Sequence, residues 1–265
     1  MPKNEARLLA PSERRQLTLC RWLWDEPAEG AWNMALDEAL LEAADIDGLA
    51  TLRFYGWRKP TLSLGYFQRA AERSVHVASR DCPLVRRASG GGAILHDAEL
   101  TYSLALPTAD RLAAAARGLH DSVHAALVEA LAAMGIDVRI GAGSPAKQNE
   151  PFLCFQRHGA GDVLLGDAKI AGSAQRRHRG AILQHGSVLL ARSRYAPELP
   201  GLAELTGRRL DPLELATVFR NRLGERLNLE WETSAAQSAI GDRLRTRAEM
   251  IVPAKFATAE WLNRR

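Results

Sequence analysis

Apolar residues recur at helical spacing in several stretches of the chain. Within residues 31–43 they alternate with acidic side chains, the arrangement of a helix that packs one face against a core. The alanine-rich stretch 109–134 has a similar periodicity and ends at Gly135, and the charged stretches 211–227 and 235–249 show it again near the C-terminus. We therefore expect helices over these ranges.

Short apolar runs bounded by glycine, proline and polar residues lie between the helical stretches and are typical of β-strands. The predicted strands cover residues 51–55, 61–64, 83–87, 93–96, 101–106, 163–165, 169–171 and 181–190. A polar stretch over 69–79 is predicted to be helical. Because a glycine-rich turn joins the run 83–87 to the run 93–96, these two strands and the run 101–106 are expected to form an antiparallel meander.

This mixture of elements predicts an α+β fold with a mostly antiparallel sheet flanked by helices. The pattern divides the chain into an N-terminal extension (1–19), a core (20–192) and a short helical C-terminal portion (193–265) packed on the same domain. A hydrophobic content of 46% and a charged content of 25% in 265 residues are those of a folded globular protein, and they exclude a disordered or fibrous one.

The chain carries a formal net charge of +4, which favours acidic protein partners. No clustered basic stripe of the kind found in DNA readers is visible, so nucleic acid is not expected as a partner. The arginine-rich run 176–179 is either part of a docking surface for an acidic partner or a solvated loop. The N-terminal residues are charged throughout and later apolar stretches are too short to cross a bilayer, so we expect neither export nor a membrane partner.

The cysteines, Cys20, Cys82 and Cys154, are odd in number and far apart. This pattern indicates neither a disulfide framework nor a thiolate zinc site, and it fits a reducing cytoplasm. Several histidines show no ligand-like grouping, so no metal site is expected. They are His76, His120, His124, His158 and His178.

The most informative segment is 86–103, with the sequence RRASGGGAILHDAELTYS. Three successive glycines let the backbone approach a ligand closely and present amides to it. Arg86 and Arg87 place positive charge beside this turn. Taken alone, the pattern also fits a flexible hairpin loop with two solvated arginines.

Together with other segments in the same order, this one resembles the signature of the lipoate–protein ligase and octanoyltransferase family. The other segments are AWNMALDEALLE (31–42), RFYGWRKPTLSLGYFQ (53–68), KIAGSAQ (169–175) and AILQHGSVLL (181–190). Ordered motifs spread over about residues 20–190 are more specific than any one of them alone. The resemblance implies an α+β catalytic domain shared with biotin–protein ligases, an acyltransferase core over 20–192, and a tunnel for a lipoyl or octanoyl chain between the glycine turn and the lysine of KIAGSAQ.

Two features are similar to the LipM-type octanoyltransferases of that family. His96-Asp97 is followed by AELTYS, where ATP-using ligases more often have a Gly-Asn pair, and Cys154 lies 15 positions before Lys169. The resemblance implies transfer of octanoate from octanoyl-[acyl carrier protein], through a Cys154 thioester, to the lysine of a lipoyl domain or of the glycine-cleavage H protein. This would be the first step of protein lipoylation and would need no cofactor.

Three alternatives stay open at this point. The first is a lipoate–protein ligase of the same fold, which would use ATP and Mg and in which Cys154 would be incidental. The second is an amidotransferase that moves the acyl group between lipoyl domains. The third is a non-catalytic module that binds carrier proteins.

The resemblance makes Cys154 the nucleophile and Lys169 the group that stabilises its thiolate, since a nearby ammonium favours the anionic form of a thiol. It also implies a set of substrate-binding residues: Arg87, Ser89, Gly90, Gly91, Gly92, His96, Gly172 and His185. Without the resemblance, Cys154 in its apolar context PFLCF would be a buried core cysteine, and both histidines would be structural. Amides of the glycine turn or of the loop after Lys169 are candidates to hold an oxyanion.

Overall fold

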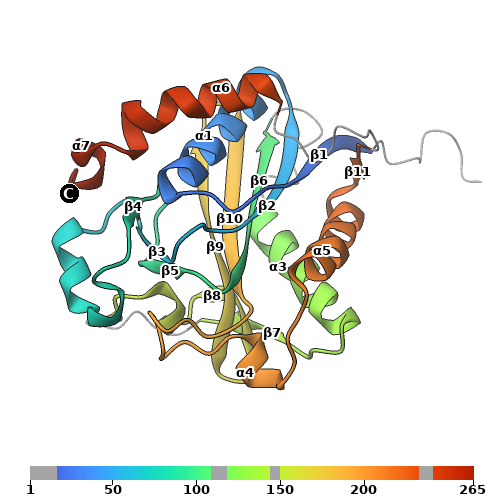
Figure 1. Cartoon of the computed structure of the whole chain (residues 1–265). Coiled ribbons are helices and arrows are strands. Elements are labelled where there is room, and N and C mark those ends of the chain that lie inside the picture. The colour runs from blue at the N-terminus through green and yellow to red at the C-terminus, as the bar shows by residue number, and fades with distance from the viewer. Residues whose placement is uncertain (1–16, 109–117, 144–149, 233–240) are drawn as a thin grey trace, which may run out of the picture.

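The computed structural model describes residues 17–108, 118–143, 150–232 and 241–265, and its central element is an eight-stranded sheet (Figure 1). In spatial order the strands are β11 (Leu229–Trp231), β1 (Thr18–Trp24), β2 (Ala50–Tyr55), β6 (Glu99–Pro107), β10 (Ala181–Leu189), β9 (Ala168–His178), β8 (Ala160–Leu165) and β7 (Arg139–Ala142). β1 is parallel to both of its neighbours, and the other adjacent pairs of this sheet are antiparallel. The expected α+β fold with a mostly antiparallel sheet is confirmed.

A second sheet has three strands, in the order β4 (Leu84–Arg86), β3 (Thr61–Leu64) and β5 (Ile94–His96). The predicted meander is wrong, because β4 and β5 each pair with β3 instead of with each other, and β6 belongs to the large sheet. The hydrogen bonds of the turn explain this arrangement. The Arg87 amide donates to the Leu64 carbonyl at 2.9 Å, and the Tyr66 amide donates to the Ser89 carbonyl at 2.8 Å. The backbone of the turn therefore pairs with the end of β3.

Helices cover both faces of the large sheet (Figure 1). α1 (Gly30–Ile46) and α6 (Asp242–Ile251) lie on one face, and α3 (Leu119–Ala133) and α5 (Pro212–Leu227) lie on the other. This arrangement requires strands that are apolar on both sides. All residues of β2 and β10 are buried, and most of them are apolar, although polar residues such as Arg53, Gln184 and His185 interrupt the two runs.

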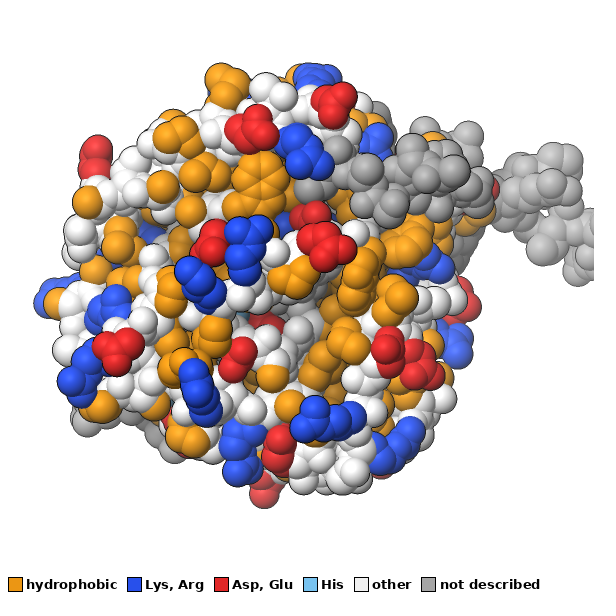
Figure 2. Space-filling model, viewed as in Figure 1, with side chains coloured by type: hydrophobic (Ala, Val, Ile, Leu, Met, Phe, Trp, Pro, Cys, Tyr) orange, Lys and Arg blue, Asp and Glu red, His pale blue; other side chains and the backbone are white. Residues whose placement is uncertain are grey.

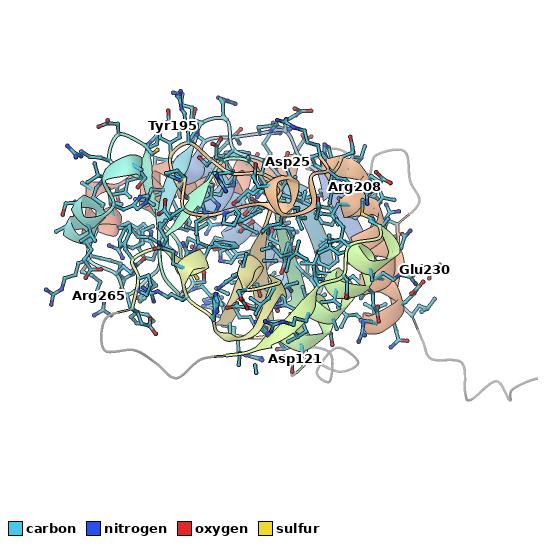
Figure 3. All side chains as sticks on the ribbon, turned by 90° about the horizontal axis from the view of Figure 1, so that it is seen from below. Asp25, Asp121, Tyr195, Arg208, Glu230 and Arg265 are labelled. Carbon is cyan, nitrogen blue, oxygen red and sulfur yellow. The ribbon has the colours of Figure 1, made fainter. Side chains whose placement is uncertain are left out.

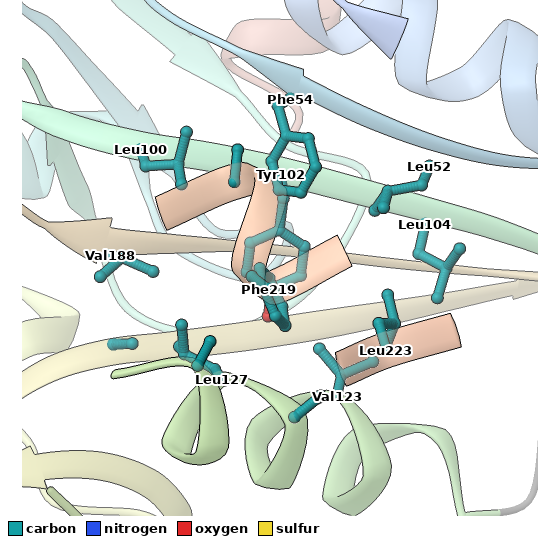
Figure 4. Close-up of a cluster of buried hydrophobic side chains, with 14 of the residues drawn as sticks. Leu52, Phe54, Leu100, Tyr102, Leu104, Val123, Leu127, Val188, Phe219 and Leu223 are labelled. Carbon is teal, nitrogen blue, oxygen red and sulfur yellow. The ribbon is translucent and has the colours of Figure 1, made fainter. Parts of the chain in front are cut away.

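Neighbouring residues of β2 belong to the two opposite cores. Phe54 packs in the cluster beneath α3 and α5, whereas Tyr55 lies in the cluster beneath α1, because successive side chains of a strand point to opposite faces. Figure 4 shows Phe54 and Tyr102 around Phe219 of α5. The ring centroids of Phe219 lie 6.0 Å from Phe54 and 5.3 Å from Tyr102, both edge to face. The same strands therefore fix the positions of the helices on both sides.

Several predicted elements differ from the structure. The polar stretch 69–79 forms two short 3-10 helices, η2 (Ala70–Val75) and η3 (Val77–Ser79), separated by the extended backbone of His76. β9 continues to His178, well beyond the predicted 169–171, because its later residues are polar and gave no apolar signal. β1, β7 and β11 were not predicted. The predicted N-terminal extension up to residue 16, and the predicted helical residues 109–117 and 235–240, lie outside the described residues.

The C-terminal elements reach back to the small sheet. After α6 the chain forms η6 (Val252–Phe256), a π-helix, and α7 (Ala259–Leu262). Trp261 Nε1 donates to the Arg86 carbonyl at 3.0 Å, and the Arg86 guanidinium donates to the Leu262 carbonyl at 2.6 and 3.0 Å. In Figure 3 Arg265 lies at the opposite end of the molecule from Glu230, which is in β11. The C-terminal helix thus braces the arginine that precedes the glycine turn. A remaining short helix, α4 (Leu202–Thr206), follows β10.

His124 ties α3 to the sheet. Its ring is fully buried, with Nδ1 2.5 Å from the Gly161 carbonyl and Nε2 2.8 Å from Ser173 Oγ. The carbonyl requires a proton on Nδ1, so the neutral ring accepts at Nε2. Burial lowers the pKa of His124 to about 4.

This pKa predicts a loss of stability in mild acid. The unfolded chain binds a proton near pH 6.5 but the folded chain binds one only near pH 4, so stability is full above this window and falls as the pH drops through it. We expect His124 to contribute about 2 kcal/mol to the loss of unfolding free energy between pH 7 and pH 5. Urea unfolding of His124→Gln should show a correspondingly weaker pH dependence, and His120→Gln on the same helix should keep the wild-type slope. Equal slopes for His124→Gln and wild type would contradict this account.

Candidate active site

Cys154 begins a short 3-10 helix, η5 (Cys154–Gln156), beside the glycine turn. Its neighbours Leu153 and Phe155 are buried in the cluster under the small sheet and anchor the segment. The Cys154 amide donates to the carbonyl of Ala93 at 2.7 Å, which ties the cysteine to the residue that follows the turn. Cys154 itself is partly exposed, so the buried core cysteine suggested by its apolar context is not what the structure contains.

Lys169 reaches the same place from β9. Its Nζ lies 3.6 Å from Cys154 Sγ and 3.3 Å from the Cys154 carbonyl oxygen. Only 5% of the lysine side chain is exposed. Because little water screens this ammonium, its charge acts more strongly on a neighbouring thiolate than the charge of a surface lysine would. The structure therefore brings together the two residues that the sequence singled out as a catalytic pair.

Asp162 completes the group and was missed in the sequence. Its Oδ2 lies 2.9 Å from Lys169 Nζ and accepts the Gly159 amide at 2.6 Å. Asp162 is in β8, and the hairpin to β9 folds it back over the lysine. The sequence feature that could have pointed to Asp162 as a site residue is a carboxylate directly before the apolar run 163–165, in a predicted hairpin. Asp162 holds the ammonium in place and balances its charge.

Gly172 provides the space that the lysine occupies. A Cβ at this position would lie 2.7 Å from Cε and 3.0 Å from Nζ of Lys169. Any larger residue would therefore push the ammonium away from Cys154. The contribution of Gly172 to the site is room for Lys169.

The glycine turn is closed around Arg87. One guanidinium nitrogen donates to the carbonyls of Gly90 at 3.1 Å and Gly92 at 2.9 Å, and the other donates to the Ser63 carbonyl at 2.9 Å and hydroxyl at 2.6 Å. Arg87 is buried, and this burial lowers its pKa to about 10. Its Nε is the one nitrogen of the group left without an acceptor among the described residues. Arg87 thus shapes the turn that borders the pocket.

Two further contacts hold the turn. A Cβ on Gly65 would lie 2.0 Å from the carbonyl oxygen of Gly91, so only glycine permits this approach of backbone to backbone. Gly91 has φ = +92°, a conformation that favours glycine. From the other side, Arg176 donates to the Ala88 carbonyl at 3.1 Å. At least this member of the arginine-rich run therefore supports the turn.

His96 is held by groups on both sides of its ring. Nδ1 lies 2.6 Å from a carboxylate oxygen of Glu99, and Nε2 lies 2.7 Å from Ser63 Oγ. The ring stacks on Trp57 with centroids 3.9 Å apart. Burial lowers the pKa of His96. His96 borders the pocket as a firmly fixed ring.

His185 is likewise held by hydrogen-bond partners on both sides of its ring. Nε2 is hydrogen-bonded to Ser89 Oγ, and Nδ1 lies 2.9 Å from Asp37 Oδ2. Arg53 donates to Asp37 Oδ1 at 3.1 Å. Burial alone would raise the pKa of Asp37, but the His185 hydrogen bond and the Arg53 charge outweigh it and lower that pKa.

Sequence analysis missed Asp37 and Arg53. Asp37 is buried on the face of α1 that packs against the sheet, and Arg53 is buried in the middle of β2. A charged residue at a core position of an otherwise apolar pattern is the signal that could have identified both, since buried charges are found in pairs.

Several of these groups border an inner pocket. Its wall includes Cys154, Arg87, His96, His185 and small or apolar residues such as Ile94, Phe155, Gly172 and Gly186. A more polar outer groove contains His120, Glu150, Arg157, Asp162 and Lys169. Cys154, Gly91 and Ser173 border both spaces. The thiol therefore stands where a largely apolar pocket meets a more polar groove.

Two absences concern only the described residues. No group of three or more His, Cys, Asp or Glu side chains there is arranged to hold a metal ion. Within the same ranges, no helix combines the length and the hydrophobicity that a membrane span requires.

Comparison with known sequences matches residues 29–194 to the lipoyl protein ligase A/B catalytic domain. Octanoyltransferase LipM of Oceanobacillus iheyensis is 34% identical over 240 residues, which cover 87% of each protein. Octanoyltransferase LipM of Moorella thermoacetica is 32% identical over 261 residues, covering 88% of this chain and 93% of that protein.

Solved structures show the same fold. A T. acidophilum lipoate–protein ligase with bound lipoic acid superposes with a TM-score of 0.73 at 22% identity, over 92% of this chain and 99% of the ligase. A structure from a study of the bi-partite lipoate–protein ligase of Thermoplasma acidophilum and its E2 lipoyl domain gives a TM-score of 0.68, over 92% of this chain and 96% of that one.

The first prediction for this site concerns the charge around the thiol. Lys169→Ala should move the pH profile of Cys154 alkylation by iodoacetamide to higher pH, because the cation 3.6 Å from the thiol is lost. Asp162→Asn should move it downward, because a neighbouring negative charge is lost. Coincident profiles for wild type and Lys169→Ala would mean that the lysine does not activate the thiol.

The second prediction concerns Gly172. Gly172→Ala should shift the alkylation profile in the same direction as Lys169→Ala, because the new methyl group displaces the ammonium. The displaced atoms are the end of a flexible side chain, so the unfolding free energy should change by less than about 1 kcal/mol. Gly241→Ala, at a glycine with no heavy atom within 4 Å, is the matched control. A wild-type profile for Gly172→Ala would show that the lysine finds another route to the thiol.

Proposed function

The chain belongs to the lipoyl protein ligase A/B catalytic domain family, and we propose that it is an octanoyltransferase that carries the acyl group as a thioester on Cys154. The observation that carries this proposal is the place of Cys154, with its Sγ 3.6 Å from a buried lysine ammonium, at the junction of the inner pocket and the outer groove. The largely apolar pocket suits an eight-carbon chain. The groove suits the extended group by which the donor protein delivers this chain or the acceptor protein receives it.

In the first half-reaction the Cys154 thiolate attacks the carbonyl carbon of the donor thioester. A carbon–sulfur bond to Cys154 forms, the bond to the donor sulfur breaks, and the donor leaves as a thiolate that takes up a proton from solvent. Lys169 stabilises the attacking thiolate. This exchange of one thioester for another needs no prior activation, and we propose that it uses neither ATP nor another cofactor.

The glycine turn supplies donors for the charge that develops on the carbonyl oxygen. The amides of Gly90, Gly91 and Gly92 have no acceptor among the described residues, and Gly90 and Gly91 border the inner pocket. Arg87 and Gly65 fix the turn, so these amides are oriented before the substrate binds. We assign the oxyanion site to this turn.

In the second half-reaction a lysine amine of the acceptor protein attacks the Cys154 thioester. The products are an amide, the free thiolate and the proton that the amine gives up, and Lys169 is placed to stabilise the leaving thiolate. We propose octanoyl-[acyl carrier protein] as the donor, and a lipoyl domain or the glycine-cleavage H protein as the acceptor. The face shown in Figure 2 mixes basic and acidic side chains, so recognition there would not rest on a region of one charge. The cysteines among the described residues are free, which supports a reducing cytoplasm as the location.

The test is to incubate the protein with octanoyl-[acyl carrier protein] in the absence of ATP. Mass spectrometry should show an octanoyl adduct on Cys154, and a lipoyl domain added afterwards should acquire the octanoyl group. Cys154→Ala and Cys154→Ser should lower transfer by at least about 10³-fold, as loss of a covalent nucleophile does. Cys82→Ala, at a buried cysteine of the small-sheet core, should keep activity. Strict dependence on ATP and free acid would instead establish a ligase.

A further inference from the structure

Met34 and His185 separate the inner pocket from a second cavity. Both residues border the inner pocket that Cys154 also borders, and both border the second cavity, whose lining includes Leu41 and Leu183. Among the described residues, these two are the members that the two linings have in common. Met34 is 3% exposed and lies on the face of α1 that packs against the large sheet. The two side chains therefore form a wall between the spaces.

The two halves of this wall differ in how firmly they are held. The His185 ring is hydrogen-bonded at one nitrogen to Ser89 and at the other to Asp37, so its position is fixed. The Met34 side chain is an unbranched thioether, which packs adaptably and offers apolar contact. The size of the side chain at position 34 therefore decides whether the wall is closed.

Another part of the pocket lining is polar and gives no such passage. Thr101 and Ser187 donate to one carboxylate oxygen of Glu99 at 2.6 and 2.9 Å, and the His96 ring lies 2.6 Å from the same oxygen. Glu99 borders a further cavity, but among the described residues that cavity has no lining residue in common with the inner pocket. An alkyl chain that pushed through this layer would break its hydrogen bonds. The apolar end of a chain is therefore better placed against Met34.

We propose that Met34 sets the length of the acyl chain that the protein accepts. This inference rests on the proposed function, in which the chain begins at the Cys154 thioester and extends into the inner pocket. The methyl end of an octanoyl chain then meets the Met34 side chain. A longer chain reaches the second cavity only by displacing that side chain. Met34 thus determines specificity and takes no part in the transfer of the acyl group.

A smaller side chain at position 34 should open the wall. Met34→Ala removes the sulfur and the carbons beside it, which frees room for the next few carbons of an acyl chain. Beyond them the chain enters the second cavity, where Leu41 and Leu183 offer apolar contact. Each buried methylene group favours binding by about fourfold. Because Glu38 and Arg176 also border this cavity, the total gain should stay below that value for each added carbon.

The experiment is a competition between straight-chain acyl thioesters of N-acetylcysteamine, from hexanoyl to dodecanoyl, at equal concentrations and without ATP. Mass spectrometry of the protein shows which acyl group occupies Cys154. The wild type should load octanoyl in preference. Met34→Ala should raise the ratio of dodecanoyl to octanoyl by at least about tenfold. Met34→Phe should favour hexanoyl, because its larger side chain shortens the pocket, so each variant tests the inference if the other fails to fold.

Two control variants locate the end of the chain. Leu41→Phe places a larger side chain in the second cavity and should by itself keep the octanoyl preference. Combined with Met34→Ala, it should abolish the gain for dodecanoyl, because the ring fills the space that the longer chain would enter. Met250→Ala makes the same change as Met34→Ala at a methionine of α6 that is 58% exposed, and it should load like the wild type.

The outcomes separate this inference from the proposed function. Acyl-enzyme with an unchanged length preference in Met34→Ala and Met34→Phe would overturn the inference and leave the Cys154 thioester intact. A dodecanoyl gain in Met34→Ala that persists with Leu41→Phe would also overturn it, because the longer chain would then end outside the second cavity. If the wild type forms no acyl-enzyme with any of the thioesters, the proposed function fails and this inference with it.

Discussion

The Arg87 guanidinium inside the glycine turn is the interaction on which the candidate site depends. It is a buried cation whose partners are backbone carbonyls and a serine hydroxyl, and its lowered pKa records the cost of removing it from water. The hydrogen bonds from this cation to the Gly90 and Gly92 carbonyls fix the path of the backbone from Arg87 to Gly92. The next residue, Ala93, accepts the Cys154 amide, so the position of the nucleophile follows from the shape of the turn.

Besides the buried Arg87, two ion-paired groups lie beside the pocket. At the mouth, Lys169 and Asp162 form an ion pair beside the thiol, and on the inner wall Arg53 and Asp37 hold His185. Arg53 also pairs with Asp25 at 2.8 Å, so the charges of both groups have partners.

The large sheet makes this arrangement possible because both of its faces are covered. β2 sends Phe54 to the core under α5 and Arg53 to the opposite face, where it meets Asp37 of α1. β9 and β10 supply Lys169 and His185 from adjacent antiparallel strands. The pocket is therefore lined by side chains from rigid elements, and the glycine turn closes it from the small sheet.

The sequence by itself determined the elements with strong periodicity and the residues that lie in ordered motifs. It predicted α1, α5 and most strands of the large sheet, since apolar spacing reports directly which side chains are buried. It also identified Cys154, Lys169 and the glycine turn through the family resemblance. The tertiary structure alone decided which distant residues meet. The pairing of β4 and β5 with β3, the ion pair of Asp162 with Lys169, and the hydrogen bonds of His185 to Asp37 and Ser89 all join segments through space. Such contacts leave no local pattern in the sequence, because the partner of a buried polar side chain is a distant residue that only tertiary packing brings beside it.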